Sequence, residues 1–372
     1  QMVGGGTAHW TGWVLRMTEN EFRPRTIYGD VPGATLADWP ITYQDLEPYY
    51  DKVEWAFGVS GEAGANAYEA PRRRGYPCPP LPPTRYNQKF YEGCAKLGYN
   101  AFPTPAAALS RPYNGRPATV QSAFAQQHGD PTGTRSNMLT TFIPDALKTG
   151  RLDLRPESYV HEITVDELGN AQSAVYQDAD GDFLEQEASV FMLACGAVES
   201  ARLLLLSRSG RFPNGLANSN DQVGRHATFH EYSAAVGTFE DPVYGWAGGG
   251  YVGASTFEFM EHGEAQGFVG GCHVASAGVG IPLLISFSLP DKPTWGQAMK
   301  EADRQYFNHT MAVGLVLHDL PQATNRVELD DTVKDAWGLP VARITHRPHP
   351  NDLAQGRWII DRNAEILEAA GA

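Results

Sequence analysis

The spacing of hydrophobic residues predicts an amphipathic helix in the first sixth of the chain. Residues 42–45 form a capping-box-like start, in which a threonine precedes an acidic residue by three positions. The apolar residues that follow recur at helical spacing: Leu46, Tyr50, Val53 and Phe57. Because proline is tolerated only in the first turn of a helix, Pro48 predicts that this helix begins near Asp45.

A second amphipathic helix is predicted at the other end of the chain, over 352–370. Its apolar positions share one face: Leu353, Trp358, Ile359, Ile366 and Leu367. Gly371 is a natural helix stop. Between the two helices, the proline-rich passage 71–83 predicts an extended excursion along the surface of the protein.

Between residues 151 and 194 the pattern changes to the two-residue alternation of strands. The expected segments, separated by turn dipeptides, are Leu152 with Leu154, then Tyr159–Val165, then Ser173–Gln177 after Gly169–Asn170, and then the segment at Phe183 after Asp180–Gly181. Consecutive strands joined by such short turns predict a β-meander.

The apolar run Ser189–Ala194 predicts a fully buried strand. It continues through the small residues 195–197 into a leucine-rich helix, expected at 200–207. Open α/β sheets bind nucleotides where a strand ends and a helix begins, so this junction is a candidate nucleotide site. Beyond residue 215, strand-like segments such as Tyr232–Phe239 and Met311–Leu317 favour a second, antiparallel domain.

Composition places the chain among globular proteins, with 42% hydrophobic and 19% charged residues. Its 372 residues predict two domains, or one domain with a large insertion. A net charge of -14 excludes a nucleic-acid partner, since phosphate binding needs an excess of Lys and Arg. No apolar run is long enough to span a membrane. The 8 Trp and 16 Tyr residues suit flat-faced ligand pockets and ordinary cores equally well.

Cysteine and histidine spacing predicts no metal centre. The four cysteines, Cys78, Cys94, Cys195 and Cys272, are widely separated and are expected to be mostly buried free thiols, with Cys195 a buried filler. His226 and His230 have the four-residue spacing of a helical metal pair, but no acidic ligand accompanies them at the required spacing, and the flanking aromatic residues favour a strand. His346 and His349 lie in a proline-rich turn and are expected at the surface.

Three successive glycines, Gly4–Gly6, occur within the first residues, where no initiator methionine precedes them. Such a run predicts a loop whose backbone approaches a ligand closely. A chain that opens in a cofactor-type loop and stops at a helix cap is expected to be a fragment of a longer enzyme.

Two motifs resemble the glucose–methanol–choline (GMC) oxidoreductase family, above all its pyranose oxidase and gluconate or sugar dehydrogenase branches. The first is 3–11, where His-Trp-Thr follows the glycines, as in the pyranose-oxidase flavin loop. The second is 196–207, which is similar to the second GMC signature, although Ala201 replaces the usual Pro or Ser and the usual glycine pair after Ser207 is absent. Segments 38–50 and 335–340 resemble the dehydrogenase branch.

The resemblance implies an α/β (α+β) fold: an incomplete Rossmann-like FAD-binding domain with the β-meander, plus a substrate domain built on an antiparallel sheet. Residues 1–40 and 130–215 are expected to belong to the FAD-binding domain, 41–129 to an excursion that covers the flavin site, and 216–372 to the substrate domain. Hydride passes from the substrate carbon to flavin N5 in this family. The catalytic histidine and its His or Asn partner are expected beyond Ala372, so the catalytic residues stay unknown.

The same resemblance implies a set of cofactor contacts: Gly4, Gly5, Gly6, Thr7, His9, Trp10, Thr11, Val160, Cys195, Gly196 and Ala197. His9 is expected either to be joined covalently to the FAD ring or to pack against it without a bond. Thr11 is expected near flavin N5, and Trp10 serves packing. Val160 is expected to meet the adenine through its backbone. The corner at 196–197 approaches the ADP half, unless its small residues serve only tight strand–helix packing.

On the substrate side His230 is the candidate residue, and the substrate is expected to be a sugar, glycoside or polyol. The electrons go to oxygen, to a quinone or dye, or to a partner subunit, and oxidase and dehydrogenase stay undecided. Residues 118–133 lack the clustered cysteines of the iron–sulfur branch, which argues against a cluster in this chain. An oligomer of a bacterial enzyme, in the cytoplasm or the periplasm, is expected. The alternative from another class is a non-catalytic carbohydrate-binding or assembly subunit.

Overall fold

The computed structural model describes residues 2–121, 129–261, 264–280 and 292–372, together with residues 282, 285 and 289. Its largest sheet has five antiparallel strands in the order β1-β6-β7-β8-β5. The strands are β1 (Phe102–Pro103), β5 (Glu231–Thr238), β6 (Ala254–Thr256), β7 (Cys272–Gly278) and β8 (Thr310–Leu317). The predicted antiparallel sheet is confirmed, and β5 and β8 lie within a residue or two of the expected segments.

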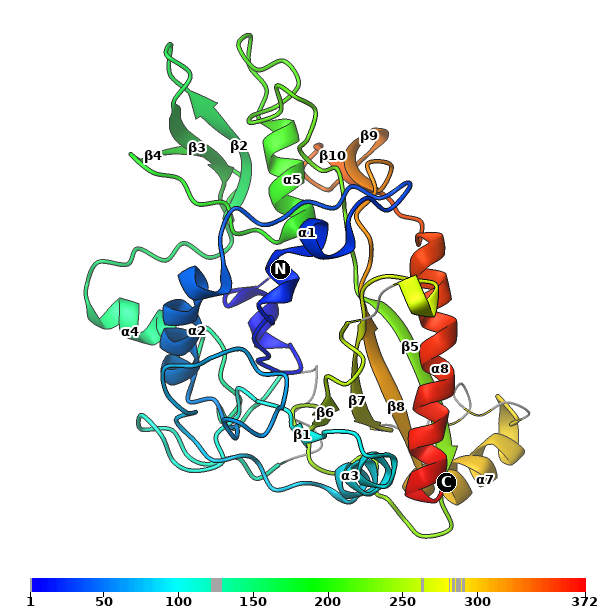
Figure 1. Ribbon diagram of the computed structural model, residues 1–372. Helices are drawn as coiled ribbons and strands as arrows, with labels where there is room; N and C mark the ends of the chain where they lie inside the picture. Colours follow the sequence, from blue (N-terminus) through cyan, green and yellow to red (C-terminus); the bar gives the residue numbers. More distant parts are fainter. Residues whose placement is uncertain are drawn as a thin grey trace.

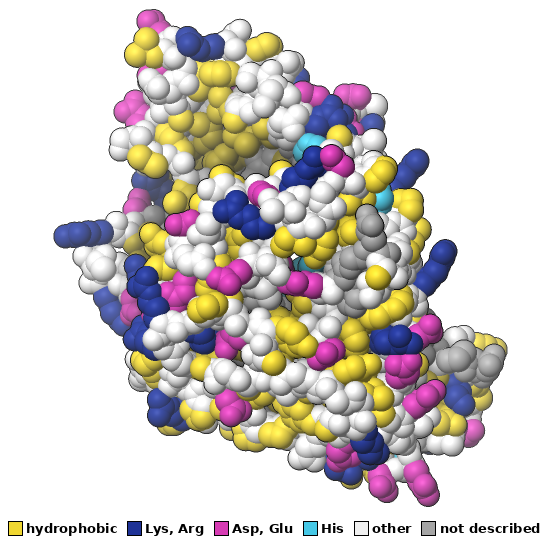
Figure 2. All heavy atoms as spheres, viewed as in Figure 1, with side chains coloured by type: hydrophobic (Ala, Val, Ile, Leu, Met, Phe, Trp, Pro, Cys, Tyr) yellow, Lys and Arg dark blue, Asp and Glu magenta, His cyan; other side chains and the backbone are white. Residues whose placement is uncertain are grey.

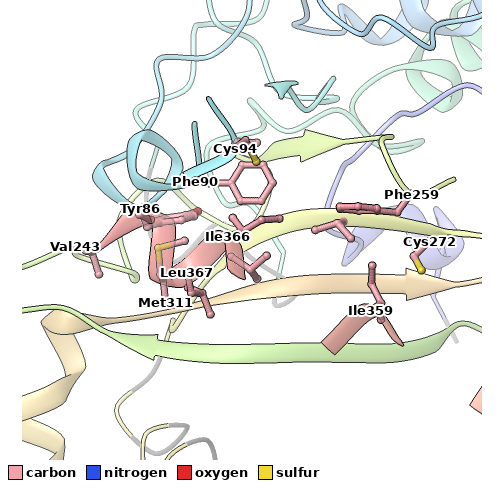
Figure 3. Close-up of a cluster of buried hydrophobic side chains, with 14 of the residues drawn as sticks. Tyr86, Phe90, Cys94, Val243, Phe259, Cys272, Met311, Ile359, Ile366 and Leu367 are labelled. Atoms are coloured by element: carbon pink, nitrogen blue, oxygen red, sulfur yellow. The ribbon is translucent and has the colours of Figure 1, made fainter. Parts of the chain in front are cut away.

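Helices α3 (Arg85–Leu97) and α8 (Pro350–Ala370) cover one face of this sheet (Figure 1). The main hydrophobic core lies between them and the strands, and Figure 3 shows Phe90 of α3 among Met311 of β8 and Ile366 of α8. Gly93 lets the two helices approach, because a β-carbon there would lie 2.4 Å from the Ile366 carbonyl oxygen. Long-range packing therefore makes the sheet and both helices one unit.

The second region of the molecule contains the predicted meander. Its strands β2 (Tyr159–Val165), β3 (Ala171–Gln177) and β4 (Phe183–Glu187) form a separate three-stranded antiparallel sheet. Helix α5 (Ala197–Leu206) lies between this sheet and the two-stranded ribbon of β9 (Arg326–Lys334) and β10 (Pro340–Thr345) (Figure 1). The meander is confirmed, but Leu152 and Leu154 lie in irregular chain.

The buried strand expected at 189–194 is wrong. The segment is irregular and forms no strand within the described part of the chain, and 80% of Val190 and 88% of Met192 are exposed. An apolar run becomes a buried strand only where neighbouring strands pair with it on both sides, and the described residues supply none. The following helix begins three residues earlier than predicted, at Ala197, directly after Gly196.

Helix α2 (Tyr43–Phe57) starts at the Thr42–Asp45 capping box, two residues before the predicted start, and accommodates Pro48 within its second turn. Its buried face carries Glu47 and Glu54, and Glu54 accepts two 2.8 Å hydrogen bonds from the Arg16 guanidinium. A bidentate arginine–carboxylate pair satisfies both charges at once, which a buried ion pair requires. This pair holds the chain leading away from the glycine loop against α2.

The terminal helix is confirmed, and it begins slightly earlier than predicted, with Pro350 at its first position. The surface placement of His349 is wrong: the side chain is buried, its Nδ1 accepts from the Asn351 N–H at 3.1 Å, and its Nε2 donates to the Pro32 carbonyl at 3.0 Å. His349 therefore caps α8, a role that tertiary contact with residue 32 makes favourable. His346 is half-buried rather than at the surface.

The remaining helical segments are short or peripheral. They are α1 (Pro24–Tyr28), α4 (Phe142–Lys148), α7 (Gly296–Tyr306) and the 3₁₀ turns Gly5–Ala8, Asn20–Phe22, Glu264–Gln266 and Phe307–His309. Among the described residues, no helix has the length and apolar character needed to cross a membrane. The division of the chain into 1–40 with 130–215, 41–129 and 216–372 remains a prediction, although α3, inside the second segment, shares its core with α8.

Candidate cofactor and substrate site

The glycine run begins a tight 3₁₀ turn. Gly4 adopts φ 92° and precedes the turn at Gly5–Ala8, a backbone conformation that favours glycine. The Thr7 hydroxyl donates to the Gly4 carbonyl at 2.7 Å and accepts from the Met138 N–H at 3.1 Å. Thr7 therefore fixes the turn to the chain around Met138, and its side-chain hydrogen bonds serve the loop itself.

Arg135 holds the second half of the loop. Its side chain is fully buried, and its guanidinium donates to the carbonyls of Trp10 and, at 3.2 Å, of Ala8. The Trp10 ring packs edge-on against Phe57 at 6.0 Å, and its Nε1 donates to the Ser136 carbonyl at 3.2 Å. The packing role predicted for Trp10 agrees with these contacts. Nothing in the sequence near Arg135 signalled its role, because its partners lie about 125 positions away.

A groove of about 930 Å³ separates this loop from β2 and α5. Six of the residues proposed as cofactor contacts line it: Gly5, Gly6, His9, Val160, Cys195 and Gly196. Figure 2 shows hydrophobic side chains gathered over β2 and α5 on one face of the molecule. The tertiary structure thus brings the glycine run and the 195–197 corner, almost 190 residues apart in the chain, to one cavity large enough for a ligand.

The corner after the 189–194 segment has a backbone that only glycine adopts readily. Gly196 has φ 87° and ψ 162°, and a β-carbon there would meet no atom within 4 Å. Helix α5 follows at once without a side-chain cap, so its first N–H groups are available to a ligand. The expectation that Cys195 is buried is wrong, since its side chain is exposed at this corner.

A polar cluster behind the groove fixes α5. Arg202 donates to the Asp335 carboxylate at 2.5 Å, to the Tyr159 hydroxyl at 2.9 Å and to the Pro340 carbonyl at 2.8 Å. Trp337 stacks on the Tyr159 ring with centroids 4.0 Å apart. Burial alone would raise the pKa of Asp335, but hydrogen bonds from Arg202, the Leu339 N–H and Tyr159 hold that pKa at about 2. The 335–340 motif therefore anchors the second motif to β2.

A second cavity, of about 1080 Å³, lies on the other side of the loop. Trp10, Thr11 and Trp13 line it together with the sheet face that α3 and α8 leave free. Tyr232, Val316 and His273 are directly paired across β5, β8 and β7, so their side chains share this face. Cys272 and Val274, on either side of His273, belong to the core on the opposite face.

His273 is a partly buried polar side chain of this cavity. Its ring lies edge-on to Trp13 at 5.8 Å and to Phe257 at 5.5 Å, and its Nε2 lies 2.8 Å from the Ser255 hydroxyl. Burial lowers the pKa of His273 to about 4. The imidazole is therefore neutral near pH 7 and can both donate and accept a hydrogen bond.

Two further titratable groups line the same cavity at the end of β8. His318 Nδ1 accepts from the Gly271 N–H at 3.1 Å, and its Nε2 lies 3.9 Å from Glu21 Oε1. Burial alone would raise the pKa of Glu21, but His318 and the Thr18 N–H keep that pKa below its usual value. The cavity thus combines aromatic walls with several hydrogen-bonding groups.

The other histidines and small residues named from the sequence lie in several different places in the structure. His230 is exposed and lines the second cavity, and its substrate role stays a prediction. His226 and His230 lie in irregular chain before β5, so no helix aligns them as a metal pair. Gly4 and Ala197 border the loop and the corner without lining either cavity. Part of segment 118–133, at 122–128, lies outside the described residues.

The sequence interpretation missed the residues that complete the site: Arg135, Arg202, Glu21, His273 and His318. Arg202 falls inside the second motif, and its position there was the only feature of the sequence that could have indicated a role at the site. His273 is one histidine in a weakly patterned stretch, and only the pairing of β7 with β8 shows which face it occupies.

Comparison with known proteins agrees with this architecture. The family model described as GMC oxidoreductase matches residues 32–232, more than half of the chain, so the chain belongs to the GMC oxidoreductase family. It is similar to a 2-methyl-1,2-propanediol dehydrogenase of Mycolicibacterium austroafricanum, with 33% identity over 100% of this chain and 66% of that protein. It is also 28% identical, over 92% of its length, to 62% of the fructose dehydrogenase large subunit of Gluconobacter japonicus.

Among solved structures, a formate oxidase of Aspergillus oryzae studied for FAD modification superposes with a TM-score of 0.61 at 12% identity. The match covers 98% of this chain and 66% of that chain, and it shows the shared fold. The present chain therefore spans about two thirds of the length of the proteins it matches. The family resemblance inferred from the two motifs is confirmed.

Proposed function

We propose that this chain forms the flavin-facing and substrate-facing part of an FAD-dependent oxidoreductase that oxidises a CH–OH group of a sugar, glycoside or polyol. One observation carries the proposal. A single loop contributes Gly5, Gly6 and His9 to one cavity and Trp10 and Thr11 to the other. A loop with one cavity on each side is what a redox cofactor needs if it is to be bound on one side and meet its substrate on the other.

The residues present fit FAD. Gly5, Gly6 and Gly196 all face open space where a β-carbon would meet no atom within 4 Å, so the backbone is accessible to a ligand from both sides of the groove. The uncapped start of α5 offers N–H groups and a positive dipole end to a pyrophosphate. When bound, FAD supplies the hydride acceptor for alcohol oxidation.

The chain's own residues would hold and orient that group. Gly5, Gly6 and His9 would border the ring system, with Thr11 offering a hydroxyl beside it. Val160 and Gly196 would contact the ADP half through their backbone. Arg135 keeps the loop in its conformation through the Ala8 and Trp10 carbonyls, and this contact fixes where the ring can lie.

The second cavity suits a hydroxylated substrate. Aromatic faces from Trp13 and Phe257 can cover the apolar face of a sugar, while the neutral His273 can hydrogen-bond a hydroxyl as donor or acceptor. His230 at the exposed side and Glu21 near His318 add further polar contacts. The names of the relatives, a diol dehydrogenase and a fructose dehydrogenase, support this substrate class.

The test uses the full-length gene product. We expect a yellow protein that reduces an artificial dye, or oxygen, with at least one member of a panel of sugars and polyols. His273→Leu should raise KM for that substrate, or lower kcat/KM, while the flavin content stays unchanged. A colourless full-length protein without flavin would disprove the proposal. It would favour the carbohydrate-binding or assembly subunit instead.

We also propose that His9 lies against the flavin ring, with or without a covalent bond. Acid denaturation followed by gel filtration separates these two outcomes, because colour that stays with the polypeptide requires a covalent link. The matched variant His9→Ala should release the colour if the link exists. If colour is retained by the variant, His9 is not the attachment residue. The electron acceptor and an oligomeric state remain part of this proposal, to be tested by comparing dye with oxygen and by light scattering.

A further inference from the structure

Among the described residues, one group of three side chains has the composition and spacing of a metal site, and it includes a residue expected at the surface. Glu231, Asp319 and His346 each offer one ligand atom, and these atoms all lie within 4.8 Å of one another. His346 Nε2 is 2.9 Å from Asp319 Oδ2 and 3.8 Å from Glu231 Oε1. The same imidazole nitrogen therefore faces both carboxylates.

These separations are close to those between ligands that share one cation. Nitrogen and oxygen ligands bind Zn²⁺ at about 2.0–2.2 Å, so neighbouring ligand atoms of one ion lie about 3–3.5 Å apart. The His346–Asp319 distance already falls near this range, and the widest separation in the group, at most 4.8 Å, would close by about 1–2 Å as Glu231 turns toward a bound ion. Phe229 packs edge-on against the His346 ring at 5.0 Å, which holds the imidazole in this orientation.

A second observation points to a missing ligand at the same place. The Asp319 side chain is only 1% exposed, and its Oδ2 accepts from the Phe229 N–H at 2.6 Å as well as facing His346. Its Oδ1 is buried and has no hydrogen-bond partner within the described structure. A buried carboxylate oxygen without a donor costs about 1–3 kcal/mol or more, and a cation held by both oxygens of Asp319 would remove that penalty.

The surrounding charge also favours a cation. Two carboxylates face a single imidazole, and the buried Asp352 is close enough to Asp319 to interact with it electrostatically. Asp352 Oδ2 already accepts from the Leu320 and His349 N–H groups, and Oδ1 accepts from the Asn351 side-chain amide, so Asp352 adds negative charge without competing for the ion.

We infer that Glu231, Asp319 and His346 bind one divalent transition-metal ion of the Zn²⁺ or Mn²⁺ class. One imidazole and two carboxylates are a donor set that both ions accept. The three ligands come from the start of β5, the chain after β8 and the chain after β10, so the ion joins three segments distant in sequence. Asp319 also lines the substrate cavity, which places the ion at the cavity's edge. The inference is independent of flavin binding.

The experiment measures metal binding by the full-length protein after treatment with EDTA and dialysis. We expect one Mn²⁺ per chain, counted by the loss of the free-ion electron paramagnetic resonance signal, and competition by Zn²⁺. Binding to the folded state should also raise the melting temperature in proportion to the logarithm of ion concentration. His346→Gln keeps a donor for Asp319 but removes the imidazole, and it should weaken binding at least about tenfold.

Glu231→Gln provides a second, independent variant with the same expected loss. Asp180→Asn is the matched control, because it removes a carboxylate from an exposed acidic turn and should leave binding unchanged. Melting temperatures in EDTA show whether each variant folds as the parent protein does. The inference is overturned if the parent protein binds neither ion at a saturable site, if both cluster variants bind as tightly as the parent, or if the control loses binding equally.

Discussion

The two regions that border the candidate cofactor groove are stabilised in different ways. The five-stranded sheet with α3 and α8 has a continuous hydrophobic core on one face, built from residues such as Phe90, Met311 and Ile366. The β2–β4 meander buries few apolar side chains, and every residue of β4 is exposed. It is held to α5 and to the β9–β10 ribbon by the polar cluster around Arg202.

This difference has a functional consequence. A sheet that is stabilised by packing on one face can leave its other face open as a cavity. Residues on that open face, such as His273, are then free to contact a ligand instead of filling the core. The meander and α5 instead contribute backbone and small residues to the groove, with Gly196 at its edge. Their stability rests on a few directional contacts, so single substitutions should have very different effects in the two regions.

The largest effect is expected for a core truncation in the sheet region. Phe90→Ala should lower the free energy of unfolding by about 3–5 kcal/mol, because Phe90 is fully buried and leaves a cavity. Phe183→Ala in β4 is the matched control, since 63% of that side chain is exposed, and it should change stability by less than about 0.5 kcal/mol. Denaturant unfolding checks both, and equal losses would contradict the contrast between the regions.

The next effect concerns the polar cluster of the meander region. Arg202→Met should cost about 2–4 kcal/mol, because it leaves the largely buried Asp335 carboxylate without its cation. Arg155→Met, which removes an exposed pair with Asp153 and a hydrogen bond to the Tyr176 hydroxyl, should cost less, about 1 kcal/mol. The double variant Arg202→Met/Asp335→Asn should recover part of the loss. An additive double variant would show that the two groups do not interact.

The direction of the pKa shift of Asp335 determines how the stability of the same cluster depends on pH. The pKa of Asp335 is held at about 2, below its ordinary value of 3.8, so the stabilisation is present above pH 3.8 and is lost as pH falls toward 2. His273 gives a second, wider pH window. Its pKa is lowered from 6.5 to about 4, so only the unfolded chain binds the proton between these values.

Unfolding free energy should therefore fall as pH decreases from 6.5 to 4, by up to about 3 kcal/mol for His273 alone, with no further loss below pH 4. His273→Gln should flatten that part of the stability profile relative to the parent. Equilibrium unfolding across this pH range provides the measurement. Identical slopes for the parent and the variant would show that His273 is not held neutral by burial.

The smallest stability effects are expected at the groove itself. Gly196→Ala should cost about 1–3 kcal/mol, because its φ and ψ are unfavourable for any residue with a β-carbon, although no atom blocks the space. Gly6→Ala faces open space without a positive φ, so it should be nearly neutral for folding yet weaken flavin binding by filling the groove. Measuring flavin affinity and the free energy of unfolding for each variant separates an effect on binding from an effect on folding. Unchanged affinity in Gly6→Ala would contradict the proposed cofactor position.

Much of the architecture follows from local patterns. Local patterns predict the Thr42–Asp45 capping box, the meander strands and the terminal helix. These predictions succeed because helix caps, turn dipeptides and apolar spacing act over a few residues. The 189–194 run shows the limit of such patterns. Its composition predicts a buried strand, but burial depends on neighbours, and within the described residues Val190 and Met192 have none that cover them.

The residues of the site also separate into those that local motifs predicted and those that only the tertiary structure revealed. Two short motifs, at 3–11 and 196–207, were enough to indicate the GMC oxidoreductase family and the residues of a groove. They could not reveal Arg135, whose partners are the Ala8 and Trp10 carbonyls, nor His273, whose cavity-facing orientation depends on strand pairing.

By itself, the sequence determined three of the helices, the meander turns and the two motifs that identify the family, because these features depend on residues close together in the chain. Only the tertiary structure decided that the motifs share a groove and that Glu231, Asp319 and His346 meet. It also decided that the Pro32 carbonyl holds the His349 ring that caps α8. Each of these depends on contacts between distant segments, and such contacts are set by the packing of the whole chain rather than by any local pattern.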